Sequence, residues 1–394
     1  MLSIFLIVFV GMLGTSLLAP LIPFYAARLG VSPEFITLIM ALYALCQFLA
    51  APLWGRISDA YGRKPVLMAT VAGSALGFVL LGFADSIWLL VLARVIGGVS
   101  AGNLAAAYAY VSDITTPQNR SAGLGKVGAA FGLGFVLGPG VGGLLAGGDT
   151  ALDANFARPA FAAAALSALA FIVTWMLLKE PAKSAAVKKP GSLNPFARFK
   201  GIIGHPTLAM TVGLTMLLTT AASVRESTVA LWAHDHFALD AKEIGFLFAY
   251  TGLVITACQG AVMGAVSKRI GDANLLIVGI VAYATGLGCF VVADSMTLLV
   301  VGTTLNAFGT AVFSNAPPTV ASKLAQPDER GLVLGVNQSA GSLGRFIGPT
   351  FAGTLYGQIS ITAPFSAGVV GLLLALCVAL VLRSKLAASA PSAN

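Results

Sequence analysis

Charged residues are scarce in this sequence. Only 10% of its 394 residues are Asp, Glu, Lys or Arg, whereas soluble domains carry about 25%. So few charges cannot cover the surface of a soluble protein of this size. With 57% hydrophobic residues and a mean hydropathy of +0.90, the composition indicates a polytopic membrane protein. It excludes a disordered chain and a nucleic-acid-binding protein.

Cysteine and histidine are scarce as well. The four cysteines lie in different predicted spans without disulfide or metal spacing, so we expect core residues rather than a secreted disulfide scaffold. The three histidines make no zinc motif, and no phosphate-binding Gly-x4-Gly-Lys-Ser/Thr loop is present. Gly123-x-Gly125-x-x-Gly128 has the spacing of a dinucleotide-binding loop, but it opens an apolar span and follows no strand. We therefore expect that the protein binds no metal or cofactor and that it is not an enzyme.

Long apolar runs dominate the chain. A helix needs about 20 apolar residues to cross the hydrocarbon core of a bilayer, and runs of this length in lipid must be helical. The runs centre on residues 5–26, 35–54, 66–84, 87–110, 122–146, 157–178, 207–233, 243–264, 273–292, 296–321, 332–357 and 361–383. The sequence predicts an all-α membrane protein with twelve transmembrane helices.

Basic residues orient the predicted helices. With both termini in the cytoplasm, 17 of the 23 lysines and arginines fall in cytoplasmic loops or tails, as the positive-inside rule requires. The six exceptions are Arg28, Arg158 and Lys242 outside, and Arg94, Arg225 and Arg345 within spans. This bias accounts for the net charge of +8.

The chain repeats itself at intervals of 209 to 210 residues. Ala84-Asp85-Ser86 recurs as Ala293-Asp294-Ser295, and Gly138-Pro139 recurs as Gly348-Pro349. Six spans return the second copy to the same orientation, so we expect two parallel six-helix halves that rock about a midplane site. The predicted domains are an N-terminal half over 1–183, a cytoplasmic linker over 184–205, and a C-terminal half over 206–394.

A charged segment joins the second and third spans. It reads Gly55-Arg-Ile-Ser-Asp59-Ala-Tyr-Gly62-Arg63-Lys64-Pro-Val-Leu67, in which the glycines allow tight turns and Arg63 can grip a carboxylate. The segment resembles the loop signature of the major facilitator superfamily. The resemblance implies a cytoplasmic gate formed by Gly55, Asp59, Gly62 and Arg63, joined by Asp113 at the inner end of the fourth span.

The fifth span is rich in glycine. Gly134, Gly138, Pro139, Gly142 and Gly143 resemble the signature of the drug/proton antiporter branch of that superfamily. Glycines at this spacing allow close helix packing, which is as good an explanation as a direct role in coupling. The chain is most similar to the tetracycline-efflux group within the branch, but Gly11 and Gly77 stand where that group has carboxylates.

Glu226 is the one acid that we expect inside a span. It ends a stripe on the seventh span, where polar residues spaced by 4, 4, 4 and 3 share one helix face: Thr211, Thr215, Thr219, Ser223 and Glu226. A buried carboxyl group can load and unload a proton, so Glu226 is the candidate proton carrier, and we expect Arg94 and Arg345 to take part in proton coupling with it. The alternative is a structural pair with Arg345, which lies at similar depth in the eleventh span.

Other polar residues within spans are candidates for the coupling and substrate sites. Arg94 in the fourth span matches the superfamily's basic residue there, and an intramembrane arginine is functional by default; the alternative is a buried pair that holds helices together. We expect substrate contacts from Asn103, Tyr110, Thr219, Ser223, Asn306 and Thr310. Interhelical hydrogen bonds explain any one of these residues equally well.

Together, these features predict a proton-coupled antiporter that exports a lipophilic, drug-like compound across a bacterial inner membrane. We expect its partners to be the substrate, protons and lipid, and we expect it to act as a monomer. Two alternatives remain open. One is a proton-coupled symporter that imports a nutrient, and the other is a sensor or scaffold that keeps the fold without transport.

Overall fold

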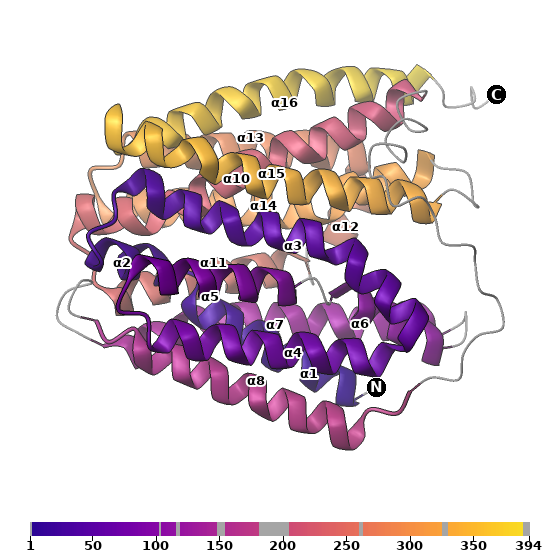
Figure 1. The fold of residues 1–394 in the computed structure, drawn as a ribbon. Helices are drawn as coiled ribbons and strands as arrows, with labels where there is room; N and C mark the ends of the chain where they lie inside the picture. Colours follow the sequence, from indigo (N-terminus) through magenta and orange to yellow (C-terminus); the bar gives the residue numbers. More distant parts are fainter. Residues whose placement is uncertain are drawn as a thin grey trace. The chain divides into compact units, whose positions relative to one another are not determined.

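The computed structural model describes residues 2–101, 104–115, 119–147, 154–180, 205–259, 263–324 and 330–388. Within these ranges the chain forms fifteen α-helices and no β-strand (Figure 1). The helices are α1 (Leu2–Leu18), α2 (Ile22–Arg28), α3 (Pro33–Tyr61), α4 (Arg63–Gly82), α5 (Ile87–Ser100), α6 (Leu104–Ile114), α7 (Arg120–Ala146), α8 (Ala157–Leu177), α10 (Pro206–Phe237), α11 (Ala241–Ala257), α12 (Met263–Ile270), α13 (Asp272–Val291), α14 (Met296–Leu324), α15 (Arg330–Gln358) and α16 (Ala363–Ala388).

These helices make up the twelve expected transmembrane segments. Three segments consist of two helices each, namely α1 with α2, α5 with α6, and α11 with α12, and every other segment is one helix. Among the described residues, nine helical stretches are long and apolar enough to cross a membrane. The all-α, twelve-helix fold predicted from the sequence is confirmed, with a turn at residues 19–21 between α1 and α2. Residues 102–103, between α5 and α6, and residues 260–262, between α11 and α12, lie outside the described residues.

Contacts divide the chain into two compact units. The first comprises Met1–Gly191 and Ala230–Gly252. In it α1 packs against α7 and α8, and α4 packs against α5 and α8. Apolar side chains of α1, α4, α6 and α7 form its main core cluster, including Ile4, Leu67, Val111 and Val127.

The second unit comprises Ser192–Val229 and Leu253–Asn394. Here α13 packs against α14 and α16, while α10, α14 and α15 share a smaller apolar cluster around Leu208, Ala321 and Val336. The predicted domain limits at 183/184 and 205/206 follow from the repeat rather than from contacts, and they stay a prediction.

The internal repeat is visible as the same helix crossing in both units. In the first, the Ser16 hydroxyl of α1 donates to the Gly134 carbonyl of α7 over 2.7 Å. In the second, the Ser223 hydroxyl of α10 donates to the Gly344 carbonyl of α15 over 3.0 Å. Both glycine-bearing helices carry an internal proline, Pro139 in α7 and Pro349 in α15. The two crossings therefore share their backbone approach and their hydrogen bond.

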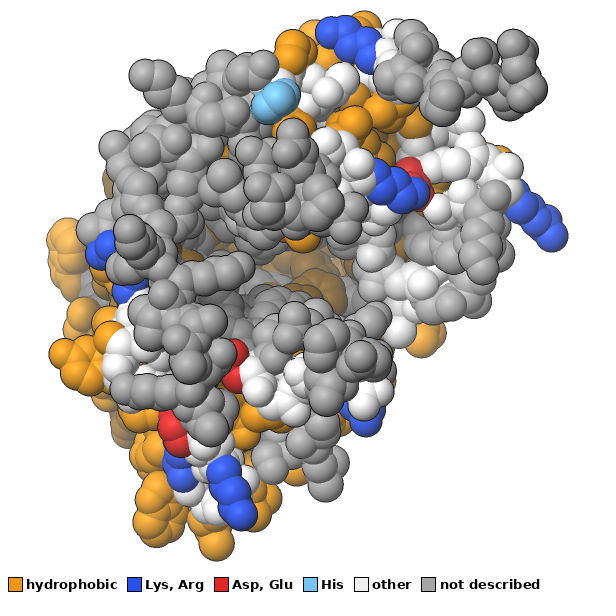
Figure 2. Space-filling view, turned by 90° about the vertical axis from the view of Figure 1, so that its right-hand side faces the viewer, with side chains coloured by type: hydrophobic (Ala, Val, Ile, Leu, Met, Phe, Trp, Pro, Cys, Tyr) orange, Lys and Arg blue, Asp and Glu red, His pale blue; other side chains and the backbone are white. Residues whose placement is uncertain are grey.

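Large apolar side chains cover the outside of several helices. On α8, Trp175 is 62% exposed and Met176 68%, and on α16 Leu373 and Leu374 are more than half exposed. Figure 2 views the face at the right-hand side of Figure 1, where blue Lys and Arg side chains and a few red acidic ones accompany orange hydrophobic side chains. Exposed apolar side chains on successive turns fit a lipid-facing surface.

Candidate functional site

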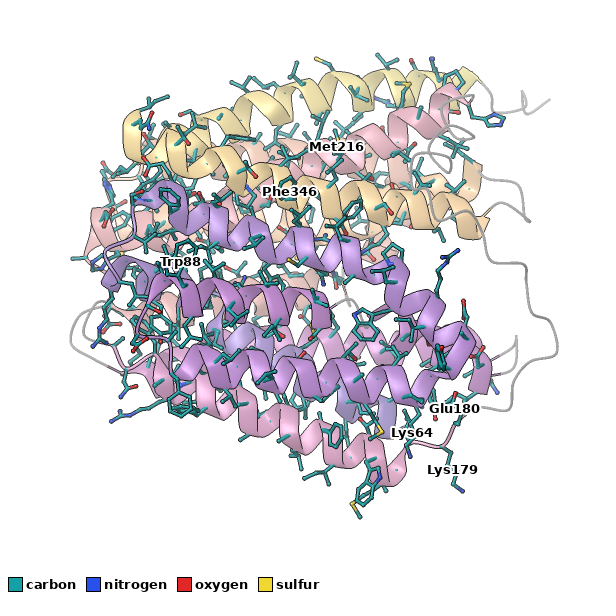
Figure 3. The ribbon with its side chains drawn as sticks, viewed as in Figure 1. Lys64, Trp88, Lys179, Glu180, Met216 and Phe346 are labelled. Carbon is teal, nitrogen blue, oxygen red and sulfur yellow. The ribbon has the colours of Figure 1, made fainter. Side chains whose placement is uncertain are left out.

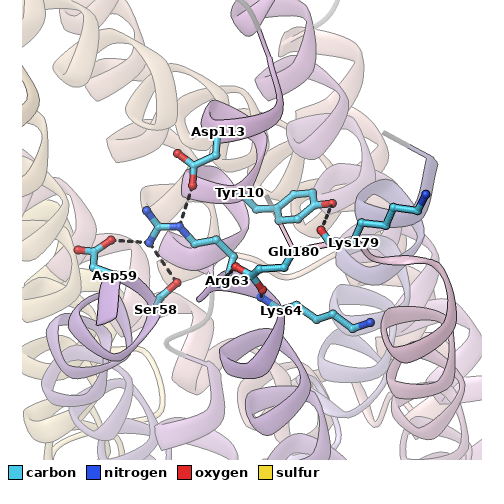
Figure 4. Close-up of polar contacts among 8 residues, drawn as sticks. All are labelled: Ser58, Asp59, Arg63, Lys64, Tyr110, Asp113, Lys179 and Glu180. Carbon is cyan, nitrogen blue, oxygen red and sulfur yellow. Dashed lines mark hydrogen bonds and ion pairs between the residues drawn. The ribbon is translucent and has the colours of Figure 1, made fainter. Parts of the chain in front are cut away.

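Arg63 is the centre of a polar cluster at one end of the first unit (Figure 4). Its Nε donates to Asp113 Oδ2 of α6 over 2.9 Å, and its Nη1 donates to Asp59 Oδ1 and, over 3.1 Å, to the Ser58 hydroxyl. One guanidinium therefore holds two carboxylates from α3 and α6. The structure brings together Asp59, Arg63 and Asp113, three members of the predicted cytoplasmic gate.

Glu180 is a member of this cluster that the sequence analysis missed. Its carboxylate accepts the backbone N–H groups of Arg63 over 2.6 Å and of Lys64 over 2.8 Å. It thus satisfies two of the unpaired N–H groups at the start of α4, where a negative charge also suits the helix dipole. Lys64, Lys179 and Glu180 lie at one end of the unit, and Trp88 lies toward the other (Figure 3). The end of the α8 segment is thereby fixed to the gate.

The two gate glycines differ in their surroundings. Gly62 is the single residue between α3 and α4, with φ +109°, and a Cβ built on it would lie 2.7 Å from Glu180 Oε1. Gly55 lies inside α3 rather than in a loop, and a Cβ built there meets no atom of the described residues within 4 Å. The expected tight turn at Gly55 is wrong, because α3 continues to Tyr61.

We expect Gly62→Ala to destabilise the protein more than Gly271→Ala does. Gly271 has φ +79°, but a Cβ built there meets nothing within 4 Å, so its substitution adds only backbone strain of about 1–2 kcal/mol. Gly62→Ala adds the same strain and displaces Glu180, which costs about a further 1–3 kcal/mol through two unpaired N–H groups. Thermal unfolding midpoints of the two purified variants in detergent measure the difference. Equal shifts would contradict the role of Glu180.

The second unit contains a related cluster with the opposite charges. Asp272, the first residue of α13, accepts the Ser267 hydroxyl and pairs with Lys323 of α14. By the repeat, Ser267 corresponds to Ser58, Asp272 to Arg63 and Lys323 to Asp113. The first unit thus has a central arginine held by carboxylates, and the second has a central carboxylate held by a lysine. The offset of 209 to 210 residues was the signal that could have found this pair.

Glu226 lies in a polar cluster of the second unit. The Arg225 Nε donates to the Tyr283 hydroxyl of α13 over 3.2 Å, and Tyr283 also bonds to Thr310 of α14. Arg225 and Arg345 are the cations that act on the Glu226 carboxylate, although neither forms a direct ion pair with it among the described residues. Hydrogen bonds therefore link Arg225, the residue next to Glu226, to Tyr283 and Thr310, and Arg345 acts on Glu226 through its charge alone. The sequence analysis gave Arg225 and Tyr283 no role.

The polar stripe of α10 packs against α15. Thr215 donates to the Asn337 side chain over 2.6 Å. Thr219 donates to carbonyls of its own helix, and a Cβ built on Gly344 would lie 2.8 Å from the Met216 carbonyl oxygen. Met216 and Phe346 mark this crossing in Figure 3. Thr219 and Ser223 stay predicted substrate contacts, but their hydroxyls are engaged within the unit.

The remaining substrate candidates are dispersed. Asn306 is fully buried, with its Nδ2 bonded to the Gly302 carbonyl over 2.7 Å and its Oδ1 unpaired among the described residues. The Tyr110 hydroxyl donates to the Lys179 carbonyl over 3.0 Å, which places it beside the Arg63 cluster (Figure 4). Asn103 lies outside the described residues. Of these candidates, only Thr310 lies within the cluster around Glu226.

Arg94 lies on α5, in the interior of the first unit. Its guanidinium carbon stacks 4.1 Å from the centre of the Tyr43 ring of α3. Its Nε is buried without a hydrogen-bond partner, and no ion pair within the described ranges involves it. The expected alternative, a buried pair that joins helices, takes the form of a cation–π contact rather than an ion pair.

The glycines of α7 lie at close helix contacts. A Cβ built on Gly134 would lie 2.8 Å from the Leu13 backbone nitrogen, and one built on Gly142 would clash with the Leu17 carbonyl. Gly138 lies against Ser16. Gly143 belongs to another face of α7, 3.0 Å from Lys242 Cα at the start of α11 by the same measure. Larger residues at these positions would separate α7 from α1 or α11.

Similarity to known proteins extends over nearly the whole chain. A sequence profile described as Major Facilitator Superfamily matches residues 4–257 and, in a second match, residues 226–393. The chain belongs to the major facilitator superfamily. This facilitator is therefore a multi-pass membrane protein that binds small-molecule substrates within the membrane, and it is not an enzyme.

Several relatives of this facilitator are resistance proteins. It is 30% identical to the class C tetracycline resistance protein of Escherichia coli over 334 residues, which cover 84% of this chain and 83% of that protein. It is 26% identical to multidrug resistance protein 2 of Bacillus subtilis (strain 168), with 91% and 88% covered. The resemblance to the tetracycline-efflux group is confirmed.

Solved structures agree with this assignment. The human organic anion transporter MFSD10 has a TM-score of 0.71 and 25% identity, with 96% of this chain and 98% of that chain covered. The nucleoside transporter NupG has a TM-score of 0.79 at 16% identity, and it shows the shared fold alone.

Proposed function

We propose that this facilitator is a proton-coupled antiporter that exports lipophilic, drug-like small molecules across a bacterial inner membrane by alternating access. Glu226 carries the proposal, because it is the one acid among the described residues that lies in the interior of a membrane-spanning helix. The resemblance to tetracycline and multidrug resistance proteins supports export. In this proposal both termini are cytoplasmic and the protein acts as a monomer.

The surroundings of Glu226 suit a group that exchanges a proton. Its carboxyl group is partly buried on α10, seven residues before Ala233, so water solvates the anion less well than in a loop. Arg225 and Arg345 are near enough to act on its charge, and neither forms an ion pair with it among the described residues. A carrier must take up and release its proton within the membrane, and Glu226 is the described carboxyl group placed to do so.

Accumulation of lipophilic dyes and antibiotics in pump-deficient bacteria tests this function. Cells that express the chain should retain about tenfold less of a transported compound than vector controls. An uncoupler should restore accumulation, because export then has no proton gradient to use. Export that continues in uncoupled cells would contradict proton coupling, and exclusion of no compound would contradict export.

The alternative, nutrient import by symport, makes the opposite prediction. Cells that express the chain would then accumulate more of a substrate when the outside is acidic. The direction of net movement in vesicles with an imposed pH gradient distinguishes the two functions. The relatives named as resistance proteins favour export.

A further inference from the structure

The interior of the first unit holds a positive charge with no negative partner among its described residues. Every described carboxylate of this unit lies at a helix end or in a loop: Glu34, Asp59, Asp85, Asp113, Glu180, Asp235, Asp240 and Glu243. Arg94 lies in the middle of α5, and no described carboxylate forms an ion pair with it. A guanidinium stays protonated in proteins, so this charge persists in the unit.

Arg94 borders a narrow hollow between helices of the first unit. Tyr43 of α3, Thr15 of α1 and Ser74 of α4 line it together with the arginine. The other lining residues are apolar or glycine. Thr15 and Ser74 also line an adjoining hollow between α1, α4 and α8. The hollow thus has one cation, a few hydroxyl groups and hydrocarbon walls.

The side chains around Arg94 leave part of its hydrogen-bonding capacity unused. The guanidinium carbon lies over the face of the Tyr43 ring, and the Tyr43 hydroxyl bonds to Thr15. The Nε–H has no acceptor among the residues that the structure describes, although burying such a donor unpaired costs about 1–3 kcal/mol. The planar fork of N–H groups matches a carboxylate, sulfonate or phosphate in two-point geometry.

The described side chains within the spans also have a net positive charge. The described residues place three arginines within spans, Arg94, Arg225 and Arg345, against the single carboxylate of Glu226. Their sum is positive whether Glu226 is ionised or protonated. Such a membrane interior repels organic cations and attracts organic anions, because charges act over longer distances at low dielectric.

We propose that the exported compounds are amphipathic organic anions whose charged group binds Arg94. This inference rests on the proposed export function and specifies its substrate class. An inside-negative membrane potential drives each such charge outward by about 2.3 kcal/mol per 100 mV. Export of an anion therefore draws on the electrical gradient as well as on protons, whereas import of an anion works against it.

Three pyrene probes of matched size test the charge preference. We would measure binding of pyrenebutyrate, its methyl ester and pyrenebutyltrimethylammonium to the purified protein in detergent by tryptophan-to-pyrene energy transfer. The wild type should bind the carboxylate about tenfold more tightly than the ester, and the cation least. Equal affinities for the carboxylate and the ester would overturn the proposal.

Substitutions at Arg94 separate binding from stability. Arg94→Gln should remove the preference for the carboxylate and leave affinity for the ester unchanged, and Arg94→Lys should retain part of the preference. Arg158→Gln is the matched control, because Arg158 is an exposed arginine at the start of α8. If Arg94→Gln weakens all three probes equally, the arginine is structural and the proposal fails. A thermal unfolding scan accompanies each variant.

The binding assay separates this inference from the proposed export function, because it requires neither transport nor a gradient. Anion-selective binding through Arg94 without export in cells would refute the export function alone. Export of neutral or cationic dyes, with no anion preference in binding, would refute the substrate class alone.

Discussion

Glu226→Gln should abolish proton-driven export while the protein still folds and binds its substrate. Glutamine matches glutamate in shape but cannot release a proton, so the cycle loses its coupling step. We expect export from cells to fall by about a hundredfold, the size typical of a lost general acid or base. Glu226→Asp keeps the carboxyl group and should retain part of the activity.

Stability distinguishes the carrier from the structural alternative. If Glu226 serves mainly to neutralise Arg345 or Arg225, Glu226→Gln leaves a buried guanidinium uncompensated and should lower the thermal unfolding midpoint. A carrier predicts lost export with a nearly unchanged midpoint. Asp294→Asn, an exposed acid in the loop before α14, is the control that should alter neither quantity. Undiminished export by Glu226→Gln would refute the assignment.

Arg63→Asp should have the second large effect. The substitution removes the cation that holds Asp59 and Asp113 and places a third carboxylate between them. The lost charge-assisted hydrogen bonds and the new repulsion together amount to about 2–5 kcal/mol. Because α3, α4 and α6 meet at this residue, we expect transport to fall about tenfold or more, measured as the initial rate of dye export.

The second unit provides the matched rescue. Lys268, Asp272 and Lys323 occupy the repeat positions of Asp59, Arg63 and Asp113 with opposite charges. A triple variant, Asp59→Lys with Arg63→Asp and Asp113→Lys, copies that arrangement and should recover much of the lost rate. If it performs no better than Arg63→Asp alone, the exact residues at this site matter, and the complementarity of their charges does not.

The sequence was sufficient to predict the twelve spans because lipid leaves an apolar run no alternative to a helix. It also placed Asp59, Arg63 and Asp113 in one cluster, because the superfamily resemblance linked residues that lie on different helices. The Glu180 contact to the backbone of Arg63 spans 117 residues. No local pattern indicates such a contact, since it depends on where the end of the α8 segment lies in space.

Periodicity showed which residues of α10 share a face but not what that face meets. Thr215, Thr219 and Ser223 lie against the glycines of α15. Glycine leaves room for a neighbouring backbone without a side-chain signal of its own, so the partner helix was not predictable from α10. For the same reason Tyr283, an aromatic residue in an apolar span, gave no sign that it would bond to Arg225.

The serine-to-glycine crossing shows which features the two units have in common and which belong to one unit alone. The bond from Ser16 to Gly134 and that from Ser223 to Gly344 are the same feature in both units, so the two units share this way of packing their helices. Arg94 corresponds to Thr303, and Glu226, three residues after its serine, corresponds to Ala19. Neither charge is shared between the copies. The two units thus share their helix packing, whereas the groups proposed to bind substrate and proton each belong to one unit alone.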